Sequence, residues 1–364
     1  MNLSLLQRTI ITFILISALL PVSPAWAAPP RYVFQDLGVL PNCDISSAHG
    51  LNNAGQVVGY GIQAYPFPIY DRAFLKNYGQ PMEDLGTLGG NNSYAKAVNN
   101  SGQVVGYAYD AVGTYGRQRA FLKNPGESMQ DLGTLGGNES RAYGLNNAGQ
   151  VVGYAQDALG KVHAFLKKPG QLMEDLGTLG GNSSEAKGIN NAGQVVGDSR
   201  IISGWSHAFL KNPGESMFDL GTLGGTTSVV NAINDAGQIV GNSFNAAGVV
   251  RAFLKNPGGS LQALPILDKF STSNANGINQ TGQIVGSANL AAEPQQLHAV
   301  LWDKGVMYDL NDLTVNLPFP GALHYATGIN DQGWITVSTG YSSGAGLLIP
   351  GGDLSPSINL LLLD

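Results

Sequence analysis

Short apolar runs separated by polar, glycine-rich turns follow one another along the whole chain. Val195-Val196 and Ala208-Phe209-Leu210 are two such runs. No window holds apolar residues at helical spacing for long, and Gly or Pro interrupts the sequence about every ten residues. The pattern therefore predicts an all-β protein of short strands with little helix. Because the runs are apolar at successive positions, we expect sheets that are covered on both faces.

Around residue 190 the pattern predicts four strands joined by turns. Asn191-Ala192-Gly193 suits a tight hairpin, because Gly accepts the positive φ that the bulge position of such a turn requires. Gly180–Ser183 is expected to turn the chain from the first strand into the second, and Asn212–Glu215 to end the fourth. The four expected strands are Met173–Leu179, Glu185–Asn190, Gln194–Asp198 and His207–Lys211.

This unit is copied along the chain. The segment Asp175–Asn182 recurs almost letter for letter at Asp84, Asp131 and Asp219. The spacing between successive turn glycines runs from 44 to 51 residues, which is the range of propeller blades with four strands each. We therefore expect a β-propeller of seven blades, each of four antiparallel strands. The seven turn glycines are Gly55, Gly102, Gly149, Gly193, Gly237, Gly282 and Gly333.

Two other architectures fit the repeat less well. A parallel β-helix prefers shorter coils and has no need of tight Asn-x-Gly hairpins. Two smaller domains are disfavoured because the units continue without a linker. A closed ring requires one blade built from both chain ends. Either Tyr32–Leu40 or the apolar tail Ser357–Leu363 could supply the closing strand, and the sequence does not choose between them.

The first 27 residues have the features of an export signal. Arg8 supplies the positive charge, and Ile10–Leu20 is an apolar run too short to span a bilayer, which argues against an uncleaved anchor. Ala25-Trp26-Ala27 is a small-x-small cleavage site before Ala28. We therefore expect residues 1–27 to be removed and residues 28–364 to form the propeller domain. Its expected location is extracellular, at the cell surface or in the periplasm, without a membrane span after cleavage.

The net charge limits the classes of binding partner, and the cysteine content limits the disulfides that can form. Residues 28–364 carry 18 basic and 25 acidic side chains, because Arg8 is the only charged residue before them, and the net charge is −7. Acidity without a basic stripe argues against nucleic acid as a partner. Cys43 is the single cysteine, so no internal disulfide forms. We expect a buried thiol and a monomeric protein.

The repeated motifs resemble a known family. The triplets His163-Ala164-Phe165 and His207-Ala208-Phe209 occur together with Asp-Leu-Gly-Thr-Leu-Gly-Gly and Asn-x-x-Gly-Gln-Val-Val-Gly motifs, and the likeness covers roughly residues 33–349. In these motifs the chain is similar to the HAF repeat proteins, described as probable extracellular repeat proteins of bacteria. The resemblance implies an exported or surface-exposed protein of no established catalytic activity. The chain departs from the family pattern where Arg72, Arg119 and Arg251 replace the histidine of the triplet.

Repeated polar residues are expected to belong to the scaffold. Three of the five histidines, His163, His207 and His298, share one repeat position and so cannot meet at one metal. The repeated aspartates lack the acidic ladder of a calcium loop, and a turn or strand hydrogen bond is their expected role. Motifs of serine hydrolases, zinc proteases and phosphate-binding loops are absent, so no catalytic residue, metal or cofactor is predicted. These aspartates are Asp36, Asp84, Asp131, Asp175 and Asp219.

We base the functional prediction on the segments whose sequence differs between the repeats. The loop between the third and fourth strand of each expected unit varies in sequence, and in several units it carries aromatic residues. Alternating strand directions place these loops on one face of the ring, where exposed aromatics on a rigid scaffold form a plausible binding surface. The alternative is that they pack on their own blade. The candidate ligand-binding residues are Tyr65, Phe67, Tyr70, Tyr109, Tyr115 and Trp205.

We therefore interpret the chain as a secreted or cell-surface binding module and not as an enzyme. Its expected ligand is an extracellular carbohydrate, with sugar stacking on the loop aromatics as one specific option, or a protein. One alternative is an enzyme that acts on extracellular polysaccharide, a hydrolase or a lyase, for which Asp110 and Glu293 are weak carboxylate candidates. The other alternative is a purely structural envelope protein.

Overall fold

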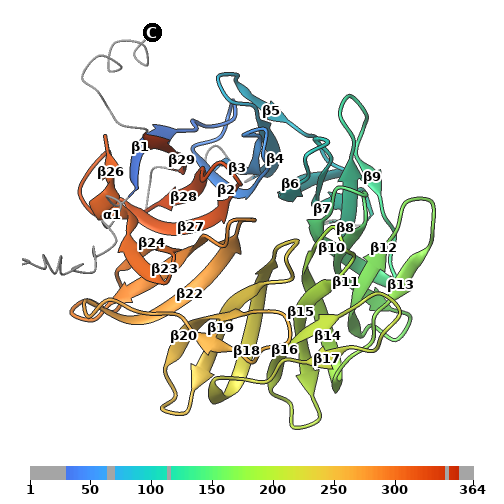
Figure 1. The fold of residues 1–364 in the computed structure, drawn as a ribbon. Helices are drawn as coiled ribbons and strands as arrows, with labels where there is room; N and C mark the ends of the chain where they lie inside the picture. Colours follow the sequence, from blue (N-terminus) through green and yellow to red (C-terminus); the bar gives the residue numbers. More distant parts are fainter. Residues whose placement is uncertain (1–29, 64–69, 113–115, 341–343, 352–364) are drawn as a thin grey trace, which may run out of the picture. The chain divides into compact units, whose positions relative to one another are not determined.

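The hairpin turns fold each repeat into a small antiparallel sheet, and seven such sheets stand around a common axis in the described part of the chain (Figure 1). The computed structural model describes residues 30–63, 70–112, 116–340 and 344–351. The described residues from Arg31 onward form one compact unit. The arrangement is a seven-bladed β-propeller, as the spacing of the turn glycines predicts. The expected export signal lies outside the described residues.

Each of the first six blades is a four-stranded meander. Blade 1 contains β2 (Ile45–Leu51), β3 (Val57–Gln63), β4 (Tyr70–Lys76) and β5 (Met82–Asp84). Blade 2 contains β6 (Gly89–Val98), β7 (Val104–Asp110), β8 (Gln118–Lys123) and β9 (Gln130–Asp131). Blade 3 contains β10 (Gly136–Leu145), β11 (Val151–Asp157), β12 (Val162–Lys167) and β13 (Met173–Asp175).

The next three blades repeat this plan. Blade 4 contains β14 (Gly180–Ile189), β15 (Val195–Ile201), β16 (Ser206–Lys211) and β17 (Phe218–Asp219). Blade 5 contains β18 (Gly224–Ile233), β19 (Ile239–Asn245), β20 (Val250–Lys255) and β21 (Gln262–Ala263). Blade 6 contains β22 (Phe270–Ile278), β23 (Ile284–Leu290), β24 (Leu297–Asp303) and β25 (Val306–Asp309).

Blade 7 joins the two ends of the ring. Its sheet order is β26-β1-β29-β28-β27, in which β1 pairs antiparallel with β29 and Val33 lies opposite Ile349. The N-terminal strand therefore closes the propeller, which decides between the two predicted candidates, while the tail 357–363 lies outside the described residues. The strands are β1 (Arg31–Asp36), β26 (Thr314–Val315), β27 (Leu323–Ile329), β28 (Ile335–Thr339) and β29 (Ala345–Gly351).

Helix is nearly absent from the described residues. The helix α1 (Leu310–Leu313) spans four residues between blades 6 and 7 and begins at an N-cap, Asp309, whose side chain accepts a hydrogen bond from the Asn311 amide. Among the described residues, no helix has the length and apolar character that crossing a membrane requires.

The unit boundaries differ from the expected ones in one respect. Met173–Leu179 was expected to be one strand followed by a turn at Gly180–Ser183, but β13 ends at Asp175 and forms the outer strand of blade 3. The chain crosses to blade 4 over residues 176–179, and β14 begins at Gly180 itself. The reason is that Gly181 lies so close to the backbone of Arg200 that a Cβ would clash, so this glycine packs against the neighbouring strand instead of forming a turn.

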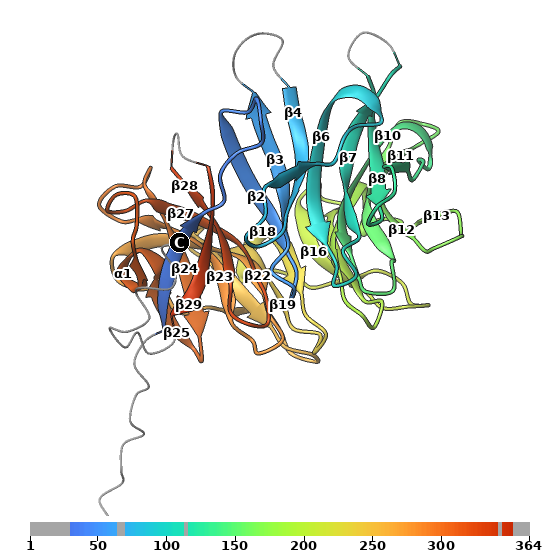
Figure 2. The same ribbon diagram turned by 90° about the horizontal axis from the view of Figure 1, so that it is seen from above.

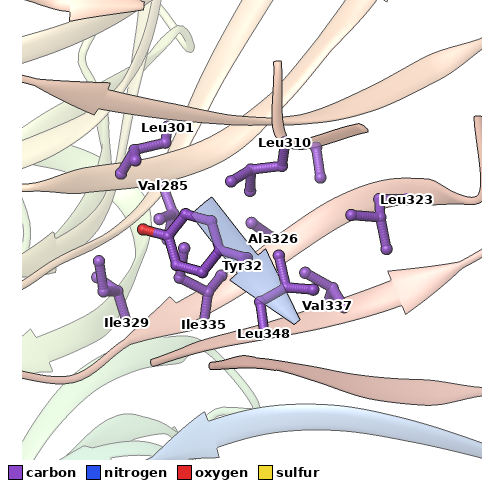
Figure 3. Close-up of a cluster of buried hydrophobic side chains, with 11 residues drawn as sticks. Tyr32, Val285, Leu301, Leu310, Leu323, Ala326, Ile329, Ile335, Val337 and Leu348 are labelled. Atoms are coloured by element: carbon purple, nitrogen blue, oxygen red, sulfur yellow. The ribbon is translucent and has the colours of Figure 1, made fainter. Parts of the chain in front are cut away.

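The core lies between adjacent blades. Phe209 of blade 4 is fully buried against Val152 and Ala164 of blade 3, and both faces of a blade are covered in this way. Figure 3 shows the corresponding cluster at the ring closure, where Tyr32 of β1 packs against Leu348 and Val337 of blade 7. The expectation of sheets covered on both faces is confirmed.

Two closed circles of hydrogen bonds tie the blades together at one end of the inner strands. The buried asparagine that starts each hairpin donates from Nδ2 to the backbone carbonyl of its counterpart in the next blade, at 2.9 to 3.1 Å, and Asn330 closes the circle onto Asn52. In a second circle, the backbone amide of the following residue donates to the side chain of the next blade's counterpart, at 2.8 to 3.1 Å.

Candidate functional site

The first strand of each blade is the innermost one, and successive first strands contact each other around the ring. Each carries a β-bulge three residues before its hairpin asparagine; in β14 the register shifts between Ala186 and Gly188, so Lys187 is the extra residue. A bulge re-aims the side chain it carries. The residues at this position in blades 1 to 7 are of five types, in the order His49, Lys96, Tyr143, Lys187, Asn231, Asn276 and Thr327.

Blades 5 and 6 show the scaffold role of this position. Asn231 donates from Nδ2 to the Ala275 carbonyl of the next blade at 2.7 Å, and Asn276 donates to Ala326 at 2.9 Å. In blades 1 to 4 the position is instead filled by a histidine, a tyrosine and two lysines. None of these four side chains is an amide, so the bond from an amide side chain to the next blade's carbonyl belongs to the bulge positions of blades 5 and 6.

A ladder of aromatic and cationic side chains surrounds Lys96. The rings of Tyr94 and Tyr107 stack with centroids 4.7 Å apart, and the Tyr60 ring meets Tyr94 edge-on at 5.0 Å. The Arg141 guanidinium lies 4.6 Å from the Tyr107 centroid, and the Lys96 ammonium lies 5.7 Å from that of Tyr60. Cations over aromatic faces attract the ring quadrupole, so the ladder is held by cation–π contacts as well as by stacking.

The ladder continues into blade 4 through charged groups. The Lys187 ammonium lies 4.6 Å from the Tyr143 ring centroid and 2.7 Å from Oε2 of Glu185. Glu185 and Asp198 are opposite each other on β14 and β15. We call the whole set the inner cluster; its members are His49, Tyr60, Tyr94, Lys96, Tyr107, Arg141, Tyr143, Tyr154, Glu185, Lys187 and Asp198.

Burial and neighbouring charge shift the pKa values in the inner cluster. Burial, with Arg141 and Lys187 nearby, lowers the Lys96 pKa to about 8, and burial together with Lys96 lowers the His49 pKa to about 3. Burial raises the Tyr107 pKa to about 12 and the Asp198 pKa to about 7, the latter against the opposing charge of Lys187. At neutral pH the cluster therefore presents a neutral His49, charged Lys96 and Arg141, and a neutral Tyr107.

Hydrogen bonds connect the inner cluster to the ends of blades 1 and 2 at which the second strand turns into the third, here called the upper edge. The Tyr94 hydroxyl donates to Oδ2 of Asp71 at 2.5 Å. Arg141 donates from Nε to Oε1 of Gln118, which in turn donates from Nε2 to the Tyr109 hydroxyl at 2.7 Å. The edge where strands 2 and 3 of these blades meet therefore belongs to the same network.

The six predicted ligand-binding residues fall in three groups. Tyr109 joins the network around the inner cluster, and Tyr70 is the first residue of β4, next to Asp71. Trp205 is 52% exposed on the turn before β16, as expected for a surface aromatic. The remaining predicted residues, Tyr65, Phe67 and Tyr115, lie outside the described residues.

The sequence prediction did not include the inner cluster itself. Its members lie on regular strands, and its blade-to-blade contacts join residues 34 to 47 positions apart, such as Tyr60 with Tyr94 and His49 with Lys96. A signal was nevertheless present. The bulge position carries five different residue types in its seven copies, while the Asn and Gly residues of the hairpin that follows are constant.

The repeated His and Asp residues have the expected scaffold roles. His163 lies 2.7 Å from Asp175 across β12 and β13, and Arg72 forms the equivalent ion pair with Asp84 at 3.0 Å. The other oxygen of Asp175 accepts a hydrogen bond from the Gly177 amide at 2.8 Å, which shapes the crossing to the next blade. The described residues contain no group of three or more His, Cys, Asp or Glu that could hold a metal ion.

The two weak carboxylate candidates take part in turns. Asp110 accepts hydrogen bonds from the amides of Val112 and Arg117 and pairs with the Arg117 guanidinium at 3.1 Å. The Glu293 carbonyl accepts the Gln296 amide in the turn before β24. On the inner strands, the structure places two carboxylates that do not recur in the other blades, Glu185 and Asp198, opposite each other.

A pocket of about 240 Å³ lies at the asparagine end of the inner strands. Residues of all seven blades line it, and most belong to the two hydrogen-bonded circles. Because its lining is nearly the same in every blade, we assign this pocket to the repeated scaffold and not to a ligand site. The inner cluster, in contrast, is confined to blades 1 to 4.

Comparison with protein-family models and with curated protein sequences finds no match. Solved structures with a similar fold include a puromycin-hydrolysing peptidase of Mycobacterium tuberculosis, with a TM-score of 0.53 and 10% identity over 85% of this chain and 52% of that chain. Two more are the BP39L lectin of Burkholderia pseudomallei (TM-score 0.49, 8% identity, 88% and 96% covered) and YCF48 bound to D1 peptide (0.49, 12%, 90% and 97%). At these identities the likeness shows the propeller fold alone, and the HAF resemblance stays a prediction.

Proposed function

We propose that this protein is an exported, non-enzymatic binding module whose ligand site is the inner cluster together with the aromatic upper edge of blades 1, 2 and 4. One observation carries the proposal. In a ring whose blades are otherwise copies of each other, blades 1 to 4 replace the inner-strand scaffold residue by aromatic and cationic groups, while blades 5 and 6 keep an amide that joins neighbouring blades. Binding sites combine a rigid scaffold with non-repeated aromatic and polar groups.

An extracellular glycan is the ligand class that we favour. Tyrosine rings offer apolar faces and hydroxyl groups together, which suits a ligand with both C–H faces and hydroxyls. Four tyrosines of the inner cluster lie within 5.8 Å of the Lys96, Arg141 or Lys187 cation, and the fifth, Tyr94, stacks on Tyr107. The exposed Trp205 supplies a further stacking surface on the same side of the ring, in blade 4.

The test is a glycan array probed with residues 28–364, followed by titration calorimetry of the best ligand. Tyr107→Ala should weaken binding about tenfold, since one stacked contact contributes on the order of 1 kcal/mol and the Arg141 side chain loses its support. The control is Asn242→Ala, which changes the same repeat position in blade 5. Equal affinity of the two variants, or an array without any bound glycan, would contradict the proposal.

A second function has one specific observation in its favour. Glu185 and Asp198 form a non-repeated carboxylate pair on neighbouring strands, and burial raises the Asp198 pKa to about 7, as for a general acid. An enzyme acting on polysaccharide would use such a pair. Incubation with extracellular polysaccharides, followed by assays for new reducing ends and unsaturated products, tests for a hydrolase or a lyase. Activity that Asp198→Asn abolishes would establish the enzyme.

A further inference from the structure

Among the residues that the structure describes, two cations of the inner cluster lack a carboxylate partner. Elsewhere in the described chain Arg72, Arg117 and Arg119 each pair with an aspartate within 3.1 Å. No such ion pair is formed by Lys96 or Arg141 among the described residues, although both side chains are half-buried. Partial burial of an unpaired cation costs free energy.

The surroundings of Lys96 are built to hold this charge without neutralising it. Its ammonium lies 3.3 Å from Nε2 of His49 and 5.7 and 5.8 Å from the ring centroids of Tyr60 and Tyr107. Arg141 rests on Tyr107 and Tyr154, at 4.6 and 5.6 Å, and donates to the neutral amide of Gln118. The ammonium of Lys96 and the guanidinium of Arg141 therefore lean on the same ring, Tyr107.

The fold itself does not require a cation at either position. Lys96 occupies the bulge position that Asn231 and Asn276 fill in blades 5 and 6, where the amide joins the blades. The counterpart of Arg141 on the first strand is Val229 in blade 5 and Asn274 in blade 6. The whole protein carries a net charge of −6, so a general basic surface does not account for the pair.

We propose that Lys96 and Arg141 together bind the carboxylate of an acidic sugar residue, a uronic acid, whose ring packs against the neighbouring tyrosines. This inference rests on the proposed function and names its ligand class. Charge-assisted hydrogen bonds from an ammonium and a guanidinium to one carboxylate would supply the missing counter-ion. The surrounding tyrosines favour a sugar over an acidic peptide, because aromatic faces lie on both sides of the two cations.

The experiment uses residues 28–364 and two matched pairs of ligands, oligogalacturonate and oligomannuronate with their methyl esters, which lack the charge. The acids should bind at least about tenfold more tightly than the esters, as expected for a hydrogen bond to a charged group. Lys96→Asn should remove most of this preference while the melting curve is preserved, because Asn is the residue that the scaffold uses at this position in blades 5 and 6. The control is Lys211→Gln, which removes a lysine on the outer hairpin of blade 4.

Each possible outcome of these binding measurements either supports or overturns the inference. Equal binding of acid and ester would overturn the inference and leave a neutral-glycan function standing, whereas binding of neither acid to the unmodified chain would overturn the inference outright. Polyglutamate serves as a third ligand, and Lys96-dependent binding of this peptide as tight as that of the acids would show that a sugar is not recognised. Failure of the wider proposed function is visible separately, as an empty glycan array. Because the acid and ester are compared on the unmodified chain, the outcome does not depend on how the variant folds.

Discussion

At the scale of single residues, the hairpin asparagine of each blade forms hydrogen bonds both within its own turn and to the next blade. Asn190 is 3% exposed and accepts the Gln194 amide at its Oδ1. Its Nδ2 donates to Oε1 of Gln194 and to the Asn234 carbonyl of the next blade. One side chain therefore shapes its own turn and holds the neighbouring blade, which explains why Asn starts all seven of these turns.

Replacing Asn190 by Ala should lower the free energy of unfolding by about 2 to 4 kcal/mol, since buried backbone groups of two blades lose their partner. The control is Asn91→Ala, because Asn91 is exposed on β6 and should change stability by less than about 0.5 kcal/mol. Urea denaturation followed by circular dichroism measures both variants. Similar midpoints for the two would show that the circle adds nothing to stability.

Phe209 and Trp205 test the distinction between core and surface aromatics. Phe209 is fully buried between two blades, so Phe209→Ala should cost roughly 3 to 5 kcal/mol through the cavity that it leaves. Trp205 is 52% exposed, and Trp205→Ala should cost less than about 1 kcal/mol while it weakens ligand binding. Paired melting curves and ligand titrations give the result. If Trp205→Ala unfolds as readily as Phe209→Ala, the predicted role of this loop aromatic fails.

The raised pKa of Asp198 should make the free energy of unfolding depend on pH. Burial raises its pKa from 3.8 to about 7, while Lys187 and the Val230 amide act in the opposite direction. Between about pH 4 and 7 the folded protein then binds more protons than the unfolded chain, so this group makes stability fall as the pH rises through that range. In Asp198→Asn that fall should be smaller. Urea midpoints measured from pH 4 to 8 check this, and an identical pH profile for the variant would refute the assignment.

At the scale of elements, the closing strand differs from every other strand because it comes from the far end of the chain. β1 covers one edge of β29 over six paired positions, and Tyr32 is 1% exposed in the core of blade 7. Without β1, the edge of β29 and the apolar side chains around Leu348 would be open to solvent. Open edges of this kind promote association between chains.

A chain that begins at Leu37 should therefore lose cooperative thermal unfolding and associate, whereas a chain that begins at Ala28 should be monomeric and melt in one transition. Analytical ultracentrifugation and calorimetry compare the two. Retention of a monomeric, cooperative fold by the shorter chain would mean that the hydrogen-bonded circles alone close the ring.

At the scale of the whole molecule, seven similar sheets form a ring in which blades 1 to 4 differ from blades 5 to 7 in the side chains of their inner strands. The asparagine circles and the inter-blade cores repeat around the described ring, as Figure 1 and its perpendicular view in Figure 2 show for the blades themselves. The aromatic and charged inner cluster occupies blades 1 to 4 only. Since stability comes from the repeated contacts, the inner-strand positions of single blades can change without loss of the fold.

Export is a property of the whole chain that the N-terminal sequence predicts. Ala25-Trp26-Ala27 should be the processing site, which gives a mature protein that begins at Ala28. Intact-mass measurement of the protein from the culture medium or periplasm of a bacterial host identifies the first residue. Recovery of the full-length chain there would contradict cleavage, and Ala27→Arg, which removes the small residue at the site, serves as the uncleaved control.

The sequence by itself determined the class of fold, the number of blades and the hairpins. These features are local or periodic: the Asn-x-x-Gly turn is shaped by its own side chains, and its recurrence every 44 to 51 residues counts the blades. The same reasoning assigned the His163 and Asp175 position to the scaffold. It misplaced the crossing at Gly180, because the close packing of Gly181 against Arg200 is a contact between strands.

Only the tertiary structure decided which chain end closes the ring and which residues meet on the inner strands. Tyr107 and Arg141 are 34 positions apart and lie on different blades, so their contact exists only once the sheets stand side by side. The bulge that sets Lys96 on the inner wall is itself a mismatch between two paired strands. Turn chemistry acts between neighbours in sequence, whereas a site formed across blades depends on ring closure, and that closure depends on β1 meeting β29.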